Sequence, residues 1–484
     1  MDISKASRRL KLTTRNEDTG IMKFTSSNQN MDDKMFQDGT PLSPSSVFTT
    51  SELKYIPNCF LSAILYCHWD NILGPRLYHV WKIENCDTPP VDILRFLSGQ
   101  ILSGEICREL DSGNIDFKFY VMPDKDVVVS SFVFSAKLDN DLAIQSIGLV
   151  LPYCNLHLYL KYHQLLQLCL RRMISKLRIL MNKASLSENV LNEFSAWLTM
   201  CFEMFSSLTE AGLPQQPRLS DTAFCPLHNL EPEFLYRCIT SHLMTFGRSL
   251  VVGKLAERVN LVISTLAVFN SDRERACSRL VLEDKPWTFH HDLCVQGLIK
   301  SKNGAIVLPM REILCSQYPT TIIDVQNRDV KQSPYSQEHK VRNYEVLRDE
   351  LICLHYNQID EHDVICSMFQ KAQYNSTLVS NLLEEISKLS ADCGIRIAHI
   401  QQFIRYLNRK ALSLIKYVET ETLKGSIPLK GGLKKLRQDL SLTIEGDFRI
   451  VIATAEKLKP GIFQFLMGDG KEIDYQSHPL GEII

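Results

Sequence analysis

The stretch "HWDNILGPRLYHVW" (residues 68–81) determines how the first part of this chain folds. It places Trp69 and Trp81 on either side of a break at Gly74-Pro75-Arg76. An apolar run precedes the break, and apolar residues alternate along the chain after it, which is the pattern of two strands joined by a turn. The stretch therefore predicts a hairpin whose turn fixes the register of its strands. A ligand pocket or a partner-binding edge built from the aromatic side chains is the alternative.

The segments that follow predict one α+β domain. Apolar residues have helical spacing in "VDILRFLSGQIL" (91–102), and strand-like runs follow at residues 115–121, 127–137 and 143–152. A long amphipathic helix is then expected over residues 156–180. The order β-β-α-β-β-β-α predicts an antiparallel sheet of five strands with helices packed on it.

The remainder of the chain predicts an α/β region followed by helices. A further helix and a proline-rich stretch typical of a domain boundary fall within residues 185–232. Short buried strands are expected at "RSLVVG" (248–253) and "TTIIDVQ" (320–326), with a helix after the first and a hairpin at residues 292–310 between them. From about residue 340 the spacing of apolar residues is helical.

Composition excludes several classes of function. Lys plus Arg (54) nearly balances Asp plus Glu (55), so no overall field favours nucleic acid. The fifteen cysteines include no CxxC pair, which indicates a reducing compartment rather than a disulfide framework. The longest clean apolar run, "LVISTLAVF" (261–269), is far shorter than the ~20 residues of a membrane helix. We therefore expect a cytoplasmic protein that reaches membranes only indirectly.

Three fragments resemble chemical motifs without completing them. In "GRSLVVGKL" (247–255) five residues separate the glycines, and Leu255 replaces the hydroxyl side chain that holds magnesium in a phosphate-binding loop. Cys225 and His228 have no second pair at zinc-finger spacing, and no metal-binding frame surrounds residues 290–292 (His-His-Asp). The sequence thus predicts no self-contained active site, no metal and no cofactor, and leaves open whether the chain is an enzyme.

A basic cluster lies toward the C-terminal end, in and just before "KGGLKKLRQ" (430–438). This composition indicates a solvated loop, and docking of an acidic partner or a lipid headgroup is the alternative. The cluster consists of Lys424, Lys430, Lys434, Lys435 and Arg437.

A series of segments, in order along the chain, resembles the C9orf DENN family. Besides the hairpin stretch, the similar segments include "SGNIDFKF" (112–119), "SHLMTFGRSLVVG" (241–253), "YPTTIIDV" (318–325) and "AEKLKPGIFQFLMG" (455–468). They are spread over most of residues 58–468. The resemblance implies a longin domain followed by a DENN module with an α/β core and a helical downstream part.

Composition and the resemblance together predict how the chain is divided: the tail is expected from its polar composition and has no match in the family, and the domains follow the resemblance. The expected parts are a disordered tail (1–56), a longin domain (57–184), a linker with an upstream helical segment (185–232), a DENN α/β core (233–340), a DENN helical part (341–470) and a C-terminal tail (471–484).

Partners and function follow from the same resemblance. It implies a complex with a second longin–DENN protein and a WD-repeat propeller protein, acting on small GTPases of the Rab and Arf classes. In that complex the chain would be a non-catalytic subunit of a GTPase-activating assembly in endosome–lysosome trafficking and autophagy, recruited to endosomes, lysosomes and autophagosomes. The alternatives are a guanine-nucleotide exchange factor for Rab GTPases and a non-enzymatic scaffold that recruits partners to lysosomes.

One group of residues is a candidate partner interface, and a second forms a structural turn. In the family the third longin strand is a sheet edge, where two longin domains join side by side by strand addition. A role of Arg76 as an arginine finger is not expected, because in the family the finger belongs to the partner subunit. The expected interface residues are Ile115, Phe117, Phe119, Tyr120 and Val121, and the structural turn comprises Trp69, Gly74, Pro75, Arg76 and Trp81. The alternative is that Phe117 and Phe119 only fill the core of their own domain.

Overall fold

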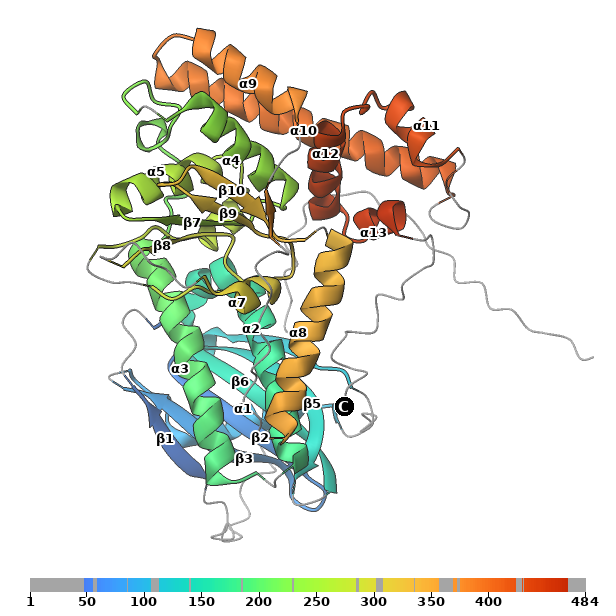
Figure 1. The fold of residues 1–484 in the computed structure, drawn as a ribbon. Helices are drawn as coiled ribbons and strands as arrows, with labels where there is room; N and C mark the ends of the chain where they lie inside the picture. The colour runs from blue at the N-terminus through green and yellow to red at the C-terminus, as the bar shows by residue number, and fades with distance from the viewer. Residues whose placement is uncertain are drawn as a thin grey trace, which may run out of the picture. The chain divides into compact units, whose positions relative to one another are not determined.

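A computed structural model gives the fold of residues 48–468 with short internal gaps. Figure 1 shows a mixed α/β, multidomain chain built on two sheets, as the sequence predicts and as a longin-plus-DENN architecture requires. The residues inside this range that are not described are 55–58, 85, 106–112, 139–140, 184–185, 229, 284–286, 302–307, 335, 357–368, 372–374, 424–428 and 430.

The first module is a six-stranded sheet with helices on both faces. It comprises β1 (Thr49–Leu53), β2 (Ala63–Asp70), β3 (Gly74–Ile83), α1 (Val91–Leu102), β4 (Asp116–Met122), β5 (Val127–Leu138), β6 (Asp141–Pro152), α2 (Leu156–Lys183) and α3 (Glu188–Ala211). The strand order is β1-β3-β2-β6-β5-β4. Alternate strand residues point to opposite faces, so one face packs on α1 and the other on α2 and α3.

The second module contains the other sheet and ten helices in the described residues. It comprises α4 (Pro232–Met244), β7 (Ser249–Gly253), α5 (Ala256–Ala267), α6 (Asp272–Ala276), β8 (Val295–Ile299), α7 (Met310–Leu314), β9 (Thr321–Asp324), β10 (Asp329–Gln332), α8 (Ser336–Tyr356), β11 (Gln370–Lys371), α9 (Thr377–Lys388), α10 (Cys393–Glu421), α11 (Gly432–Asp439), α12 (Glu445–Leu458) and α13 (Ile462–Met467). The sheet order is β11-β10-β9-β7-β8, with β7 parallel to both β8 and β9. The expected α/β core is confirmed.

The five antiparallel strands of the first module form as predicted, but β1 adds a sixth strand. It pairs in parallel with β3 at the edge of the sheet. Thr49 Oγ1 lies 2.6 Å from His79 Nδ1, and Ser51 Oγ lies 2.8 Å from His79 Nε2. The prediction of a disordered tail to residue 56 is therefore wrong for residues 49–53. A polar strand with one buried residue, Leu53, carries too little apolar signal to be recognised.

The predicted hairpin at residues 292–310 is described only in part. β8 forms and pairs in parallel with β7, whereas residues 302–307 lie outside the described part of the chain.

The two tryptophans of the opening stretch lie on opposite faces of the first sheet. Trp81 is fully buried under α3 and donates its Nε1–H to Ser195 Oγ at 2.7 Å. Trp69 is only partly buried, against the core on the α1 side. The aromatic surface around the turn is thus divided between two cores, and Trp81 has the larger structural role.

We predict that Trp81→Ala lowers the free energy of unfolding by about 3–5 kcal/mol, because it empties a buried site. Trp69→Ala should cost about 1–2 kcal/mol, since less of its surface leaves water on folding. Denaturant unfolding of the two variants beside the wild type measures both values. Equal losses would show that the two indoles are buried alike.

Candidate functional site

The turn of the opening stretch is held by local bonds. Asp70 Oδ1 accepts hydrogen bonds from the backbone N–H groups of Ile72 (2.8 Å) and Leu73 (2.9 Å). These two bonds lower the pKa of the Asp70 carboxyl. Gly74 has φ +76°, in the region that favours glycine, and Pro75 faces Trp69 across the hairpin. This geometry accounts for the Gly-Pro pair as a structural corner, with Arg76 on the following strand opposite His68.

Strand β4 lies at the edge of the first sheet, where the sequence predicts it. Phe119 and Val121 are 36% and 41% exposed, whereas Phe117 is partly buried against the core on the α2 side. Tyr120 packs on the opposite face, beneath α1. The Phe119 ring stacks on Tyr159 of α2, with ring centroids 5.0 Å apart. β4 pairs with β5 on one side only, so this edge of the sheet presents apolar side chains beside a strand whose outer side pairs with no other described strand.

The incomplete motifs have structural roles. The segment resembling a phosphate-binding loop forms buried strand β7, and Leu255 lies immediately before α5. Cys225 is buried, and His228 Nε2 contacts the Ser220 carbonyl oxygen at 2.7 Å. These segments build the strand, the helix start and the connecting loop rather than a phosphate-binding loop or a zinc site.

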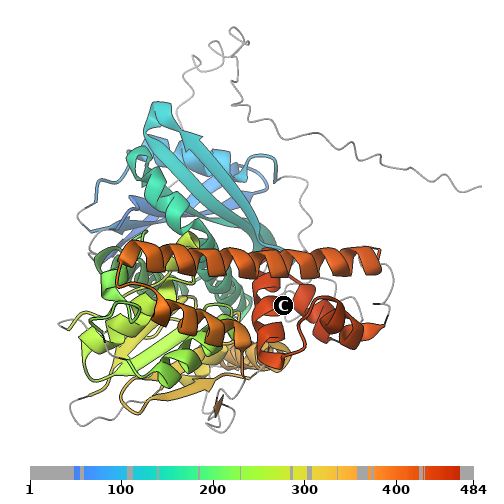
Figure 2. The ribbon, with the colours of Figure 1, turned by 90° about the horizontal axis from the view of Figure 1, so that it is seen from above.

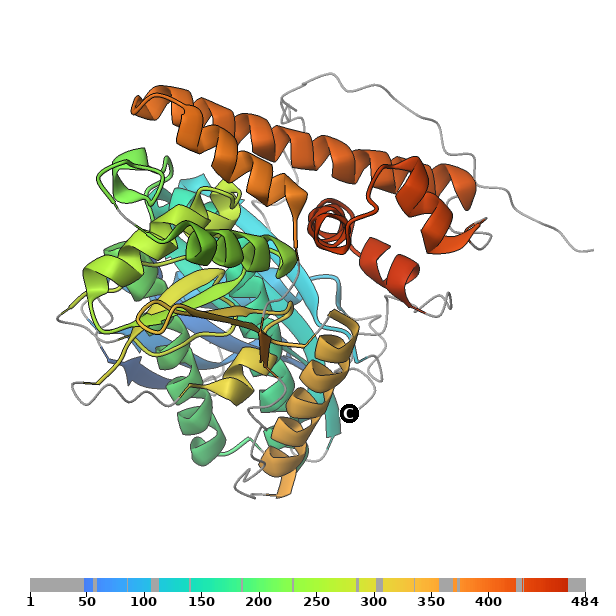
Figure 3. The same cartoon turned by 45° about the horizontal axis from the view of Figure 1, so that its top comes forward.

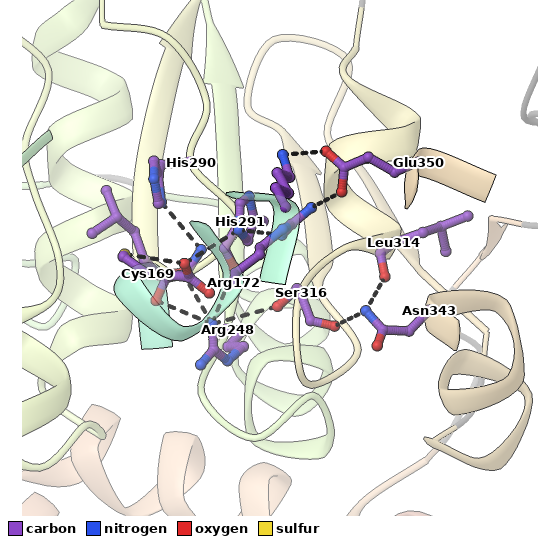
Figure 4. A network of polar contacts seen from close by, with 12 residues as sticks. Cys169, Arg172, Arg248, His290, His291, Leu314, Ser316, Asn343 and Glu350 are labelled. Carbon is purple, nitrogen blue, oxygen red and sulfur yellow. Dashed lines mark hydrogen bonds and ion pairs between the residues drawn. The ribbon is translucent and has the colours of Figure 1, made fainter. Parts of the chain in front are cut away.

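A cluster of polar contacts, which we call the polar junction, lies between α2 and the second module (Figure 4). Arg172 of α2 contacts His291 Nε2 at 2.5 Å and Glu350 Oε2 of α8 at 2.9 Å. Lys176, one turn further along α2, pairs with Glu350 Oε1 at 2.5 Å. Two cations of one helix are therefore matched by one carboxylate and one imidazole of the other module.

A second arginine holds the loop that carries the histidines. The buried guanidinium of Arg248 lies 3.3 Å from the carbonyl oxygens of both His291 and Asp292. Gln296 of β8 fixes the backbone of His290 from the other side, since its amide donates to the His290 carbonyl oxygen at 2.6 Å and accepts from its N–H at 3.0 Å. These bonds hold the backbone of the loop from both sides.

Burial and charge set the protonation states at the polar junction. Burial, reinforced by neighbouring His291, lowers the pKa of His290 to about 4. Burial alone would raise the pKa of Glu350, but Arg172 and Lys176 outweigh it and bring this pKa to about 2. At neutral pH His290 is therefore uncharged and Glu350 is ionised.

Three side chains of the polar junction have the chemistry of metal ligands. Ligand atoms of Cys169, His290 and Asp292 all lie within 4.8 Å of one another, a combination that zinc accepts. However, contact with Cys201, burial and nearby Asp292 raise the pKa of Cys169 well above its ordinary value. The thiol donates to Asp292 Oδ2, at 3.4 Å, and His291 Nε2 lies 3.2 Å from the same carboxylate oxygen. Although burial opposes them, His291 and, to a smaller extent, Arg172 lower the pKa of Asp292. The arrangement fits a hydrogen-bonded structural junction better than a metal centre.

The sequence singled out residues 290–292 but not their partners. Cys169, Arg172 and Glu350 are separated from them by about 60 to 120 residues of chain. The sequence did contain one signal for these partners. Arg172 and Lys176 lie one turn apart on α2, and two cations on a largely buried helix indicate that a carboxylate lies nearby.

The second module also carries an open groove of about 690 Å³ between α5 and the 213–230 segment. Leu227 and Leu255 on its rim are 87% and 60% exposed. Arg218 and Arg258 line it and are exposed, and their side chains form no hydrogen bond or ion pair with other described residues. Asp221 and Glu257 also line the groove, which therefore combines apolar anchors with charges of both signs, as protein-binding surfaces do.

We predict that Glu350→Gln lowers the free energy of unfolding at neutral pH by about 1–2 kcal/mol, because it leaves Arg172 and Lys176 without their carboxylate. A depressed pKa gives stability that is present above the unfolded value and is lost as pH falls through the folded one. The difference between variant and wild type should therefore shrink as pH falls from about 4.5 to 2. Denaturant unfolding across this range measures it. Glu345→Gln, which alters an exposed pair with Arg342, is the control, and an equal effect there would contradict the assignment.

Known proteins resemble this chain over nearly its whole length. The sequence profile of the C9orf72-like protein family matches residues 96–339. The human protein named "Guanine nucleotide exchange factor C9orf72" is 33% identical over 461 residues, which cover 88% of this chain and 95% of that protein. The rat and mouse proteins named as its homologues are 33% identical over 460 residues, with the same coverage. The chain therefore belongs to the C9orf72-like protein family.

Proposed function

We propose that this chain regulates small GTPases of the Rab or Arf class through surface contact, by promoting nucleotide exchange. The proposal rests on the similarity of this chain to relatives named guanine nucleotide exchange factors. The sequences are 33% identical over 88% of the chain. Exchange requires a partner surface that opens the nucleotide pocket, and no side-chain chemistry of its own. Two buried histidines are engaged in structural hydrogen bonds rather than facing a substrate. His242 contacts Ser249 and Asn270, and His339 contacts the carbonyl oxygen of Ser316.

The groove beside α5 is the surface that we assign to the GTPase. Its exposed rim leucines, Leu227 and Leu255, can enter a partner's apolar surface, and burial of such anchors provides most of the affinity of protein interfaces. Arg218 and Arg258 are free to meet acidic side chains, which speeds association and fixes orientation.

We predict that Leu227→Asp combined with Leu255→Asp slows stimulated GDP release at least tenfold, because two apolar anchors become charged. Release of fluorescent GDP from a panel of Rab and Arf proteins, with the full chain as catalyst, measures the effect. Met200→Asp, on an exposed α3 position, is the matched control and should keep wild-type activity. Undiminished release with the double variant would move the GTPase contact elsewhere.

A second candidate function is that of a non-catalytic subunit in a heteromeric GTPase-activating complex. The observation that favours it is the edge strand β4, where Phe119, Val121 and neighbouring Leu160 of α2 are exposed. A sheet of the second longin–DENN protein can add to this edge by backbone hydrogen bonds, while the apolar side chains cover one another. The WD-repeat protein and action at endosomes, lysosomes and autophagosomes belong to the same proposal.

We predict that Val121→Asp reduces co-purification with the longin–DENN partner at least tenfold and leaves the chain folded. A carboxylate at this exposed edge position is tolerated in the free chain but is desolvated in the complex. Ile72→Asp, at the 91% exposed tip of the first hairpin, is the control. Faster GTP hydrolysis only with the partner would support the activating complex, whereas faster GDP release by the chain alone would support exchange. Val121→Asp complexes at wild-type yield would refute the β4 interface.

A further inference from the structure

Helix α10 has an unusual distribution of charge. Its first 26 residues, from Cys393 to Val418, contain five Lys or Arg residues and no Asp or Glu. The chain as a whole has a net charge of −1, so this helix departs strongly from the average. Figure 2 shows α10 running along the outside of the second module, and Figure 3 shows the neighbouring helices along its other side. Positive charge is therefore concentrated on a peripheral element.

The outward side of α10, which we call the crest, carries three of these basic residues. At 100° per residue, Arg405, Arg409, Leu412 and Lys416 fall within about 60° of one another. The buried residues of α10, including Leu407, lie on the opposite side. With a rise of 1.5 Å per residue, the crest extends about 16 Å along the helix.

The charges of the crest are not used by the fold. Arg405, Arg409 and Lys416 are exposed, and none forms a hydrogen bond or ion pair through its side chain within the described part of the chain. Two nearby carboxylates have other partners, since Asp439 accepts from Tyr417 at 2.7 Å and Glu419 pairs with Lys459. The three cations therefore remain available to an external anion.

Apolar side chains stand among these cations. Leu412, within the crest, is 56% exposed, and Tyr406 on its flank is 42% exposed. Ile395, on the same flank nearer the start of the helix, is 49% exposed. Basic residues interspersed with leucine and an aromatic ring are the composition of helices that lie at the boundary between headgroups and acyl chains.

We propose that the crest of α10 docks on the anionic leaflet of a membrane, with Arg405, Arg409 and Lys416 at the headgroups and Leu412 between them. A protruding helix fits a deformable bilayer surface, whereas an acidic protein would need a complementary groove for it. Within the described residues no helix is long and apolar enough to span a bilayer, and this contact is peripheral. The sequence alone predicts indirect membrane association, and the unpaired charges of α10 support a direct contact as well.

The basic cluster that the sequence singles out is a poorer candidate. Arg437 is engaged with Glu445 at 2.8 Å and with two carbonyl oxygens. Lys424 and Lys430 lie outside the described residues, and Lys434 and Lys435 are exposed on the short helix α11.

Vesicle co-sedimentation of the full chain tests the proposal. We expect binding to phosphatidylcholine vesicles that contain 30% phosphatidylserine, no binding to pure phosphatidylcholine, and release as salt rises to about 0.5 M. Combined Arg405→Gln, Arg409→Gln and Lys416→Gln should lower partitioning about 100-fold, at about fivefold for each charge. Leu412→Ser should lower it a few-fold without changing the dependence on salt.

The matched control removes three exposed charges elsewhere, as Lys54→Gln, Lys137→Gln and Lys183→Gln in the first module, and should sediment like the wild type. Thermal unfolding of every variant checks that the fold is kept. Equal binding to neutral and anionic vesicles, equal loss in the control, or binding to a poly-glutamate peptide but not to vesicles would each overturn the proposal.

Discussion

The guanidinium of Arg172 imposes the strictest polar constraint on the contact between the two modules, beside the packing of Leu293 on the first module's core. It cannot lose its proton, so wherever the fold encloses it, acceptors must be supplied. α2 packs one side on the first sheet, as Leu166 and Ile174 show, and turns Arg172 toward the second module. His291 and Glu350 meet it there from two separate segments. A loop and a helix of the second module are thus positioned by a charge on the first.

Local patterns predicted most strands of the two sheets, because the spacing of apolar residues in each strand reflects which of its faces are buried. β5 and β6 are apolar on both faces, and the structure covers both faces with helices. α1 has the bounds that its apolar spacing predicts. Gly74 marks the turn because its positive φ excludes most other residues. In each case the structure follows from neighbouring residues or from the spacing of buried residues along the chain, and both can be read from a single sequence.

What the sequence could not show depends on distant segments. β1 is held by pairing with β3 and by His79, so its own polar residues resemble a tail. Cys169 and Asp292 meet across 123 positions, and no spacing rule relates them. The groove beside α5 is likewise formed by separate segments, so exposed Leu227 and Leu255 look like ordinary loop residues until the fold is known.

The two surfaces that we propose as contact sites are distinguished by charged side chains to which the described part of the chain supplies no partner. Arg437 and Arg405 have the same side chain but different surroundings. Arg437 forms an ion pair with Glu445, whereas the side chain of Arg405 is exposed and has no partner in the described residues. The groove and the crest of α10 are both made of such unused groups, joined by exposed leucines. A surface regulator needs contact with its target protein and a sufficient local concentration of it. If the target GTPase is held on a membrane, docking α10 on the same membrane supplies that concentration and leaves the groove to supply recognition.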